Sequence, residues 1–288
     1  MSSAETTRRP ISAQEAYQSQ ERTEGELTRR PAPVQVTYLA YAGTTGLKGI
    51  DYRLTDEVLD PAGADESRYT ERSVRLKSYW CYQAPSDAPE VGPLPAEKNG
   101  CVTFGCLNNF AKINEGVWSA WVEILKRVAG SRLIVHAREG SHRERVRARL
   151  SEAGVDGGRV EFAWSLAVKE YLDQYNRIDV GLDPFWYPGG TTTCDALWMG
   201  VPVVTVAGES AISRGGLSIY SNLGGTKWVA TDVGEYVEMA VGIAGDMEGL
   251  AEERRGLRER IRVSRLMDGV AFARDVEGVY RTICSSGS

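Results

Sequence analysis

The chain has 288 residues, enough for one large domain or two small ones, and 42% of them are hydrophobic, so a substantial core can form. Its formal net charge of −5 argues against nucleic acid as the main partner. No apolar run reaches the roughly 18 residues that span a bilayer, and the polar N-terminus lacks the apolar core of a signal peptide. We therefore expect a cytoplasmic protein without a membrane partner.

The cysteines and histidines do not form the clusters that bind metals or build disulfide frameworks. The cysteines are odd in number and scattered, without a C-x-x-C pair, so we interpret them as reduced thiols. They are Cys81, Cys101, Cys106, Cys194 and Cys284. The histidines, His136 and His142, are too few for a histidine-based metal cluster, and we interpret both as structural.

The N-terminal part of the chain changes character twice. Residues 1–30 are polar and hold few large apolar side chains, which predicts a disordered or loosely helical tail. Three short strands are then predicted, at residues 34–39, 50–55 and 73–76, with a small-residue loop at 41–46. Residues 82–100 hold four prolines and predict a connector between two parts of the chain.

From Cys101 onward, strands and helices alternate in a regular pattern. Strands are predicted at residues 101–106, 133–136, 160–162, 178–182 and 201–206. Helices are predicted at 114–128, 141–153, 167–176 and 191–199. This alternation predicts an α/β fold, with a Rossmann-like parallel sheet that has helices on both faces and right-handed crossovers. Residues 232–283 are predicted to be mostly helical, with a break near 268–269, and the Arg/Glu alternation at 252–262 predicts a solvated helix face.

The segment that begins Pro188-Gly189-Gly190-Thr191-Thr192-Thr193-Cys194-Asp195 carries the clearest chemical signal. It is predicted to form a glycine-rich loop, a short helix, a Gly stop and a buried strand. Glycines allow a ligand close to the backbone, and the first N–H groups of a helix have no internal partner, so this arrangement suits a phosphate or pyrophosphate. Asp195, one turn further on, is placed to accept bonds from ribose hydroxyls. A capped helix between two strands, without a ligand, explains the same pattern.

Four segments, in order, resemble the protein O-GlcNAc transferases, including their bacterial and plant relatives. The first runs from Arg30 to Leu39, with Gly43-Thr44-Thr45-Gly46 and Asp51-Tyr52. The second is Asn108-Asn109-Phe110-Ala111-Lys112-Ile113, and the third is the Gly-Gly-Thr-Thr-Thr-Cys-Asp-Ala-Leu-Trp-Met-Gly segment. The fourth is Ser213-Arg214, with Met267-Asp268-Gly269 and Arg274-Asp275. These segments extend the resemblance over residues 31–283.

The resemblance implies a GT-B fold and a UDP-GlcNAc:protein O-GlcNAc transferase, an inverting enzyme that glycosylates Ser or Thr with neither a cofactor nor a catalytic metal. Residues 101–283 would form the C-terminal UDP-sugar-binding domain, residues 82–100 a linker and residues 31–81 a remnant of the N-terminal lobe. The histidine motif of that lobe and the TPR repeats of many members are missing from this sequence. We therefore expect weak or no activity of the isolated chain.

The same resemblance implies roles for individual residues. Lys112 would bind the UDP diphosphate and stabilise the charge of the leaving group, which is a catalytic role, with Asn109 beside it. Thr191 and Thr192 would cap the diphosphate from the helix N-terminus, next to Gly190, where some members have His. Asp195 would hold the ribose. Arg214 either contacts the sugar nucleotide or stabilises its own loop.

Leu39, Ala40 and Gly43 match the wall beside the sugar. Ala40 and Ala42 stand where the family usually has Gly and Pro, and a methyl group at Ala40 is expected to narrow the sugar pocket.

The sequence is also compatible with functions other than that of a complete transferase. The chain could be a non-catalytic nucleotide-sugar-binding fragment, or one subunit of a split enzyme that works with a separate N-terminal lobe or a TPR subunit. The transferred sugar could also differ, for example fucose. A plain Rossmann-like scaffold without a ligand is a further interpretation.

Overall fold

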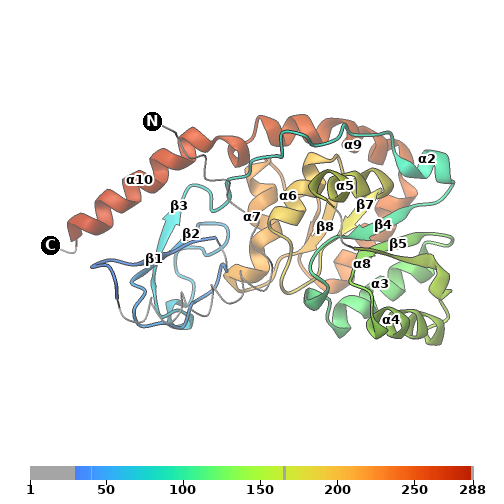
Figure 1. Cartoon of the computed structure of the whole chain (residues 1–288), viewed down its shortest axis with the longest axis horizontal. Coiled ribbons are helices and arrows are strands. Elements are labelled where there is room, and N and C mark those ends of the chain that lie inside the picture. Colours follow the sequence, from blue (N-terminus) through green and yellow to red (C-terminus); the bar gives the residue numbers. More distant parts are fainter. Residues whose placement is uncertain (1–29, 40, 165–166, 287–288) are drawn as a thin grey trace, which may run out of the picture.

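The computed structural model describes residues 30–39, 41–164 and 167–286, so the predicted tail lies outside the described residues except for Arg30. Two parallel sheets make up the molecule, a small sheet near the N-terminal end and a large sheet at the centre of the bigger body (Figure 1). The prediction of an α/β fold with a parallel sheet and helices on both faces is confirmed. In the described ranges, no helix combines the length and the apolar character needed to cross a membrane.

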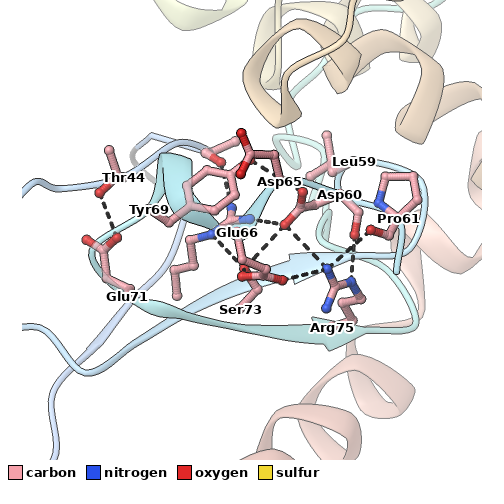
Figure 2. A network of polar contacts seen from close by, with 12 residues as sticks. Thr44, Leu59, Asp60, Pro61, Asp65, Glu66, Tyr69, Glu71, Ser73 and Arg75 are labelled. Carbon is pink, nitrogen blue, oxygen red and sulfur yellow. Dashed lines mark hydrogen bonds and ion pairs between the residues drawn. The ribbon is translucent and has the colours of Figure 1, made fainter. Parts of the chain in front are cut away.

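The small sheet has three parallel strands in the order β1-β2-β3. They are β1 (Val36–Thr37), β2 (Tyr52–Asp56) and β3 (Arg72–Leu76), at the places predicted from the sequence. A buried arginine, Arg53, fixes the loops of this sheet. Its guanidinium pairs with Asp60, donates to Ala42 O and lies 3.4 Å from the centroid of the Tyr69 ring. Figure 2 shows the surrounding network, in which Arg75 also bonds Asp60 O.

The large sheet has six parallel strands in the order β6-β5-β4-β7-β8-β9. They are β4 (Thr103–Cys106), β5 (Arg132–His136), β6 (Val160–Ala163), β7 (Val180–Leu182), β8 (Val203–Val206) and β9 (Val229–Ala230). The strand order reverses between β4 and β7. In open α/β sheets, ligands bind outside the carboxyl ends of the strands at such a reversal, because the following loops diverge there.

Both faces of the large sheet are covered, since alternate residues of each strand join different apolar clusters. In β5, Leu133 and Val135 pack with α3 (Glu115–Arg127), α4 (Ser141–Glu152) and α8 (Val233–Gly245). Ile134 points to the other face, where it packs with α5 (Val168–Asp173) and α6 (Thr191–Trp198). A separate cluster joins α6 to α7 (Gly215–Asn222) and α9 (Met247–Arg262).

The two sheets are joined by the connector and by the last helix. The connector includes a short helix, α2 (Pro95–Asn99), and α10 (Gly269–Ser286) reaches from the large body across to β3 (Figure 1). At that crossing Asp275 accepts the backbone N–H of Lys77 at 2.7 Å. Phe272 of α10 packs 5.8 Å from the ring of Tyr38.

The predicted solvated face at 252–262 is wrong in part. Arg254 is 1% exposed and donates to the carbonyls of Gly92, Ile178 and Tyr175. Its guanidinium is buried because α9 packs against α6 and the connector, and several backbone acceptors there need a donor. Charge alternation alone does not show that one of its members faces inward.

Candidate functional site

The reversal in strand order brings two loops together. The loop after β4 carries Asn109 and Lys112, and the loop after β7 leads through Pro188 into α6. The Lys112 Nζ donates to Pro188 O at 3.0 Å and lies 4.1 Å from the centroid of the Tyr187 ring. Burial lowers the pKa of Lys112, and the negative charge of Asp183 opposes that shift. A cation is thereby fixed beside the start of α6.

The N-terminus of α6 is open to a ligand. Its N-cap, Gly190, provides no side-chain cap. A Cβ at Gly189 would overlap Thr193 Oγ1, and one at Gly190 would stand 2.7 Å from the Trp80 ring. Both positions therefore require glycine because other groups approach the backbone closely. Among the described residues, the Thr191 and Thr192 N–H groups have no hydrogen-bond acceptor, and together with the helix dipole they favour an anion at this position.

A first cavity of about 180 Å³ lies between the small-sheet segment and this loop. Of the predicted residues, Lys112, Gly190, Thr191 and Leu39 line it. Sequence reasoning missed Trp80 and Tyr79, which form another wall, because single aromatics in a loop carry no motif. The remaining lining residues are Ala42, Tyr187, Pro188, Gly189, Ile212 and Gly215.

A second cavity of about 680 Å³ opens on the other side of the α6 N-terminus. Its walls include Asn109 and Thr192 together with aromatic and cationic side chains. The rings of His136 and Trp164 are 4.8 Å apart, and the Arg138 guanidinium carbon lies 4.7 Å from the Trp164 centroid. The other lining residues are Leu107, Phe110, Ala137, His142 and Tyr171.

Both histidines, interpreted above as structural, line this second cavity while also packing against aromatic rings. Burial lowers the pKa of His136, which favours the neutral form of its imidazole. Their position in the cavity wall was not visible in the sequence, because neither belongs to a recognisable motif.

Asp195 is placed behind the cavities. It is 7% exposed, and its carboxylate accepts the hydroxyls of Tyr82 at 2.8 Å and Tyr171 at 3.2 Å. Burial raises the pKa of this carboxyl, which the two hydroxyl donors oppose. Since Tyr171 lines the second cavity, Asp195 is connected to that cavity through a hydrogen bond.

Two other residues predicted from the sequence, Arg214 and Gly43, are not among the described residues that line the two cavities. Arg214 Nε donates to Val58 O at 2.7 Å, which links the loop after β8 to the small-sheet segment. Gly43 packs under Tyr41, so that a Cβ there would be 2.5 Å from the Tyr41 ring. Ala40 lies outside the described residues, so its expected effect on the sugar pocket stays a prediction.

Comparison with solved structures defines the class of this protein. The chain resembles an O-GlcNAc transferase of Thermobaculum terrenum with a TM-score of 0.84 and 36% identity, covering 91% of this chain and 50% of that one. It also shares its fold with sucrose-phosphate synthase from Thermosynechococcus elongatus, with a TM-score of 0.59, 16% identity and coverage of 83% and 60%. The fold is therefore that of the GT-B glycosyltransferases.

The model of glycosyl transferase family 41 matches residues 94–276, and the chain belongs to this family. A curated relative from Solanum lycopersicum, described as probable UDP-N-acetylglucosamine–peptide N-acetylglucosaminyltransferase SPINDLY, is 41% identical over 264 residues. That match covers 90% of this chain and 28% of the relative, so this chain spans less than a third of its length. The resemblance to protein O-GlcNAc transferases is confirmed.

Proposed function

We propose that the α6 N-terminus and the two cavities beside it bind a UDP-sugar, with the diphosphate between Lys112 and the open helix end. One observation supports this proposal: the half-buried Lys112 ammonium lies beside a helix N-terminus without a side-chain cap, where Thr191 lines one cavity and Thr192 the other. A diphosphate placed there would receive charge-assisted bonds from Lys112 and from backbone N–H groups.

The two cavities suit the two ends of such a ligand. The second cavity lies within the range of about 300–1,000 Å³ typical of small-molecule sites, and its aromatic and guanidinium groups fit a planar base. The first cavity is smaller and matches a single sugar ring. We assign the nucleoside to the second cavity, near Tyr171 and Asp195, and the sugar to the first, near Leu39.

The chemistry follows from this placement. As the bond between the sugar C1 and the diphosphate oxygen breaks, negative charge grows on the β-phosphate. The fixed Lys112 ammonium and the helix dipole stabilise that charge more in the transition state than in the ground state. Asn109, Gly190, Thr191 and Thr192 would hold the diphosphate. Asp195 would orient the ribose through Tyr171, which donates to its carboxylate and lines the second cavity. For Arg214 we propose an indirect role through its bond to Val58 O, and for Ala40 and Gly43 a place in the sugar-pocket wall.

For the whole protein we propose transfer of N-acetylglucosamine to Ser or Thr hydroxyls of a protein acceptor in the cytoplasm, without a metal. This chain corresponds to half of the solved transferase, so we assign it donor binding. Residues 101–283 would be the donor-binding domain, 82–100 a linker and 31–81 part of the N-terminal lobe. A separate N-terminal lobe or TPR subunit would supply the remaining groups.

Isothermal titration calorimetry with UDP, UDP-GlcNAc and uridine tests the donor site. We expect UDP to bind more tightly than uridine, because the diphosphate adds contacts to Lys112 and the α6 N-terminus. Equal affinities for the two, or no heat at millimolar UDP, would contradict the proposal. GDP-fucose in the same experiment distinguishes the two candidate sugars. If the protein transfers fucose, it should bind GDP-fucose more tightly than UDP-GlcNAc.

A further inference from the structure

A buried carboxylate lies directly behind the proposed diphosphate site. Asp183 follows β7 and is 2% exposed. Its backbone is fixed by the sheet, because its N–H bonds Val204 O at 2.9 Å, and by Tyr236, whose hydroxyl donates to its carbonyl at 3.1 Å. The backbone of Asp183 is thus held in place independently of the loop in front of it.

The carboxylate accepts bonds from both loops of the site. In the β7–α6 loop and the first turn of α6, the Gly189 N–H and the Thr193 hydroxyl each donate to Oδ1 at 3.2 Å. In the loop after β4, Asn108 Nδ2 donates to the same oxygen at 3.3 Å. That bond fixes the orientation of the amide, whose Oδ1 then accepts the Thr192 hydroxyl at 2.8 Å.

The buried Asp183 carboxylate lies in an electrostatically unfavourable position. A negative charge behind an anion site repels the ligand, and its own burial raises the pKa of Asp183. The Gly189 N–H and the charge of Lys112 oppose that rise. A carboxylate suits this position because both of its oxygens accept hydrogen bonds, whereas an Asn amide of the same size has one acceptor oxygen and an NH2 donor.

We propose that Asp183 is a positioning residue for the diphosphate: it anchors the Gly189–Thr193 loop and orients the Asn108–Thr192 pair. This inference rests on the proposed function. Asp183 would not contact the ligand itself, but would position the groups that do. Substitution of Asp183 should therefore weaken binding of the diphosphate part of a ligand and leave binding of the nucleoside part unchanged.

The test is Asp183→Asn, with UDP and uridine as probes and calorimetry as the readout. The Asn amide keeps one acceptor oxygen, replaces the other oxygen by an NH2 donor and removes the negative charge. We expect UDP to bind about tenfold more weakly, the effect of one lost charge-assisted bond, while uridine affinity stays within about twofold. An unchanged ratio of UDP to uridine affinity would overturn the inference.

Asp179→Asn is the matched control. Asp179 precedes the same strand, is 0% exposed and accepts two backbone N–H groups, from Ala96 at 2.8 Å and Thr103 at 2.7 Å. Asp179→Asn makes the same chemical change at a similarly buried position that does not contact the β7–α6 loop. The ratio of UDP to uridine affinity should stay that of the wild type, and a loss equal to that of Asp183→Asn would mean that burial alone explains the effect and the inference is wrong.

Thr193→Val keeps the test decisive if Asp183→Asn does not fold. It removes one hydroxyl donor to Asp183 and keeps the shape of the side chain. We expect UDP binding to weaken about threefold to tenfold with uridine binding unchanged. Unchanged UDP binding in this variant would count against the anchoring role. If the wild type itself does not bind UDP, the proposed function fails and this inference fails with it.

Discussion

The Lys112 ammonium lies 4.1 Å from the centroid of the Tyr187 ring, and its hydrogen-bond acceptor is a backbone carbonyl, that of Pro188. Over the described part of the chain, no carboxylate forms an ion pair with it. An ammonium has three donors, so those not used by Pro188 remain available to a phosphate. The ring and the carbonyl hold the cation in place without neutralising it.

The first prediction concerns the affinity that Lys112 provides. Lys112→Ala should weaken UDP binding about 10- to 100-fold, because a hydrogen bond to a charged group contributes about 1.5–3 kcal/mol. Uridine binding should change much less. Lys126→Ala removes the same charge from an exposed position of α3 and serves as the control in calorimetry. Equal losses of UDP affinity in the two variants would show that the net charge of the protein, and not the position of Lys112, determines binding.

The second prediction concerns pH. Burial lowers the pKa of Lys112 from its usual 10.5, and the protonated form binds the diphosphate, so UDP affinity should fall as pH rises through that lowered pKa. Lys112→Arg keeps the charge at high pH, and the uracil ring titrates equally in both proteins. The difference between the two affinity profiles from about pH 7 to about pH 10.5 therefore reports Lys112. Parallel profiles would contradict this expectation.

The third prediction concerns the contact between Gly190 and Trp80. A Cβ at 190 would stand 2.7 Å from the Trp80 ring, so Gly190→Ala should destabilise the fold by about 1–3 kcal/mol and weaken UDP binding. The cost should shrink in a Trp80→Leu background, which a double-mutant cycle measures by denaturant unfolding. A full cost in that background would show that the ring is not the obstacle.

Gly242→Ala is the control for that experiment. Gly242 lies inside α8, and a Cβ added there would have nothing within 4 Å, so alanine should stabilise the protein by about 1 kcal/mol. Replacement by alanine should therefore lower the free energy of unfolding at Gly190 and raise it at Gly242.

The fourth prediction concerns Arg254, whose burial lowers its pKa to about 10, so it remains charged at neutral pH. Arg254→Met leaves the carbonyls of Gly92, Ile178 and Tyr175 without their donor and should destabilise the protein by about 2–4 kcal/mol. Arg255→Met, at the next and exposed position of α9, should change stability by less than about 0.5 kcal/mol. Similar melting temperatures for the two variants would refute the structural role of Arg254.

Much of the fold could be predicted because strand and helix periodicity is a local property. The strands from 101 to 206 and the helices between them lie where the pattern places them, within two residues at most boundaries. Lys112 and the Gly189–Thr193 segment were visible for a similar reason, since each forms a compact motif.

The rest of the site depends on contacts between distant segments. Asn108 meets Asp183 across 75 residues, and Trp80 meets Gly190 only after the connector folds back. The inward orientation of Arg254 is equally non-local, because it depends on which side of α9 packs against the connector. No local pattern distinguishes these residues from ordinary polar or aromatic ones.

The crossing of α10 over β3 has a consequence for biosynthesis. The bond from Lys77 N–H to Asp275 joins positions 198 residues apart, so the small sheet leaves the ribosome long before the helix that packs on it. At about 5–20 residues per second, the delay is about 10–40 s. During that interval the first cavity, whose walls include Tyr79 and Gly215, lacks one support of its small-sheet side. Ribosome-bound chains stalled before residue 269 should therefore bind UDP more weakly than released chains.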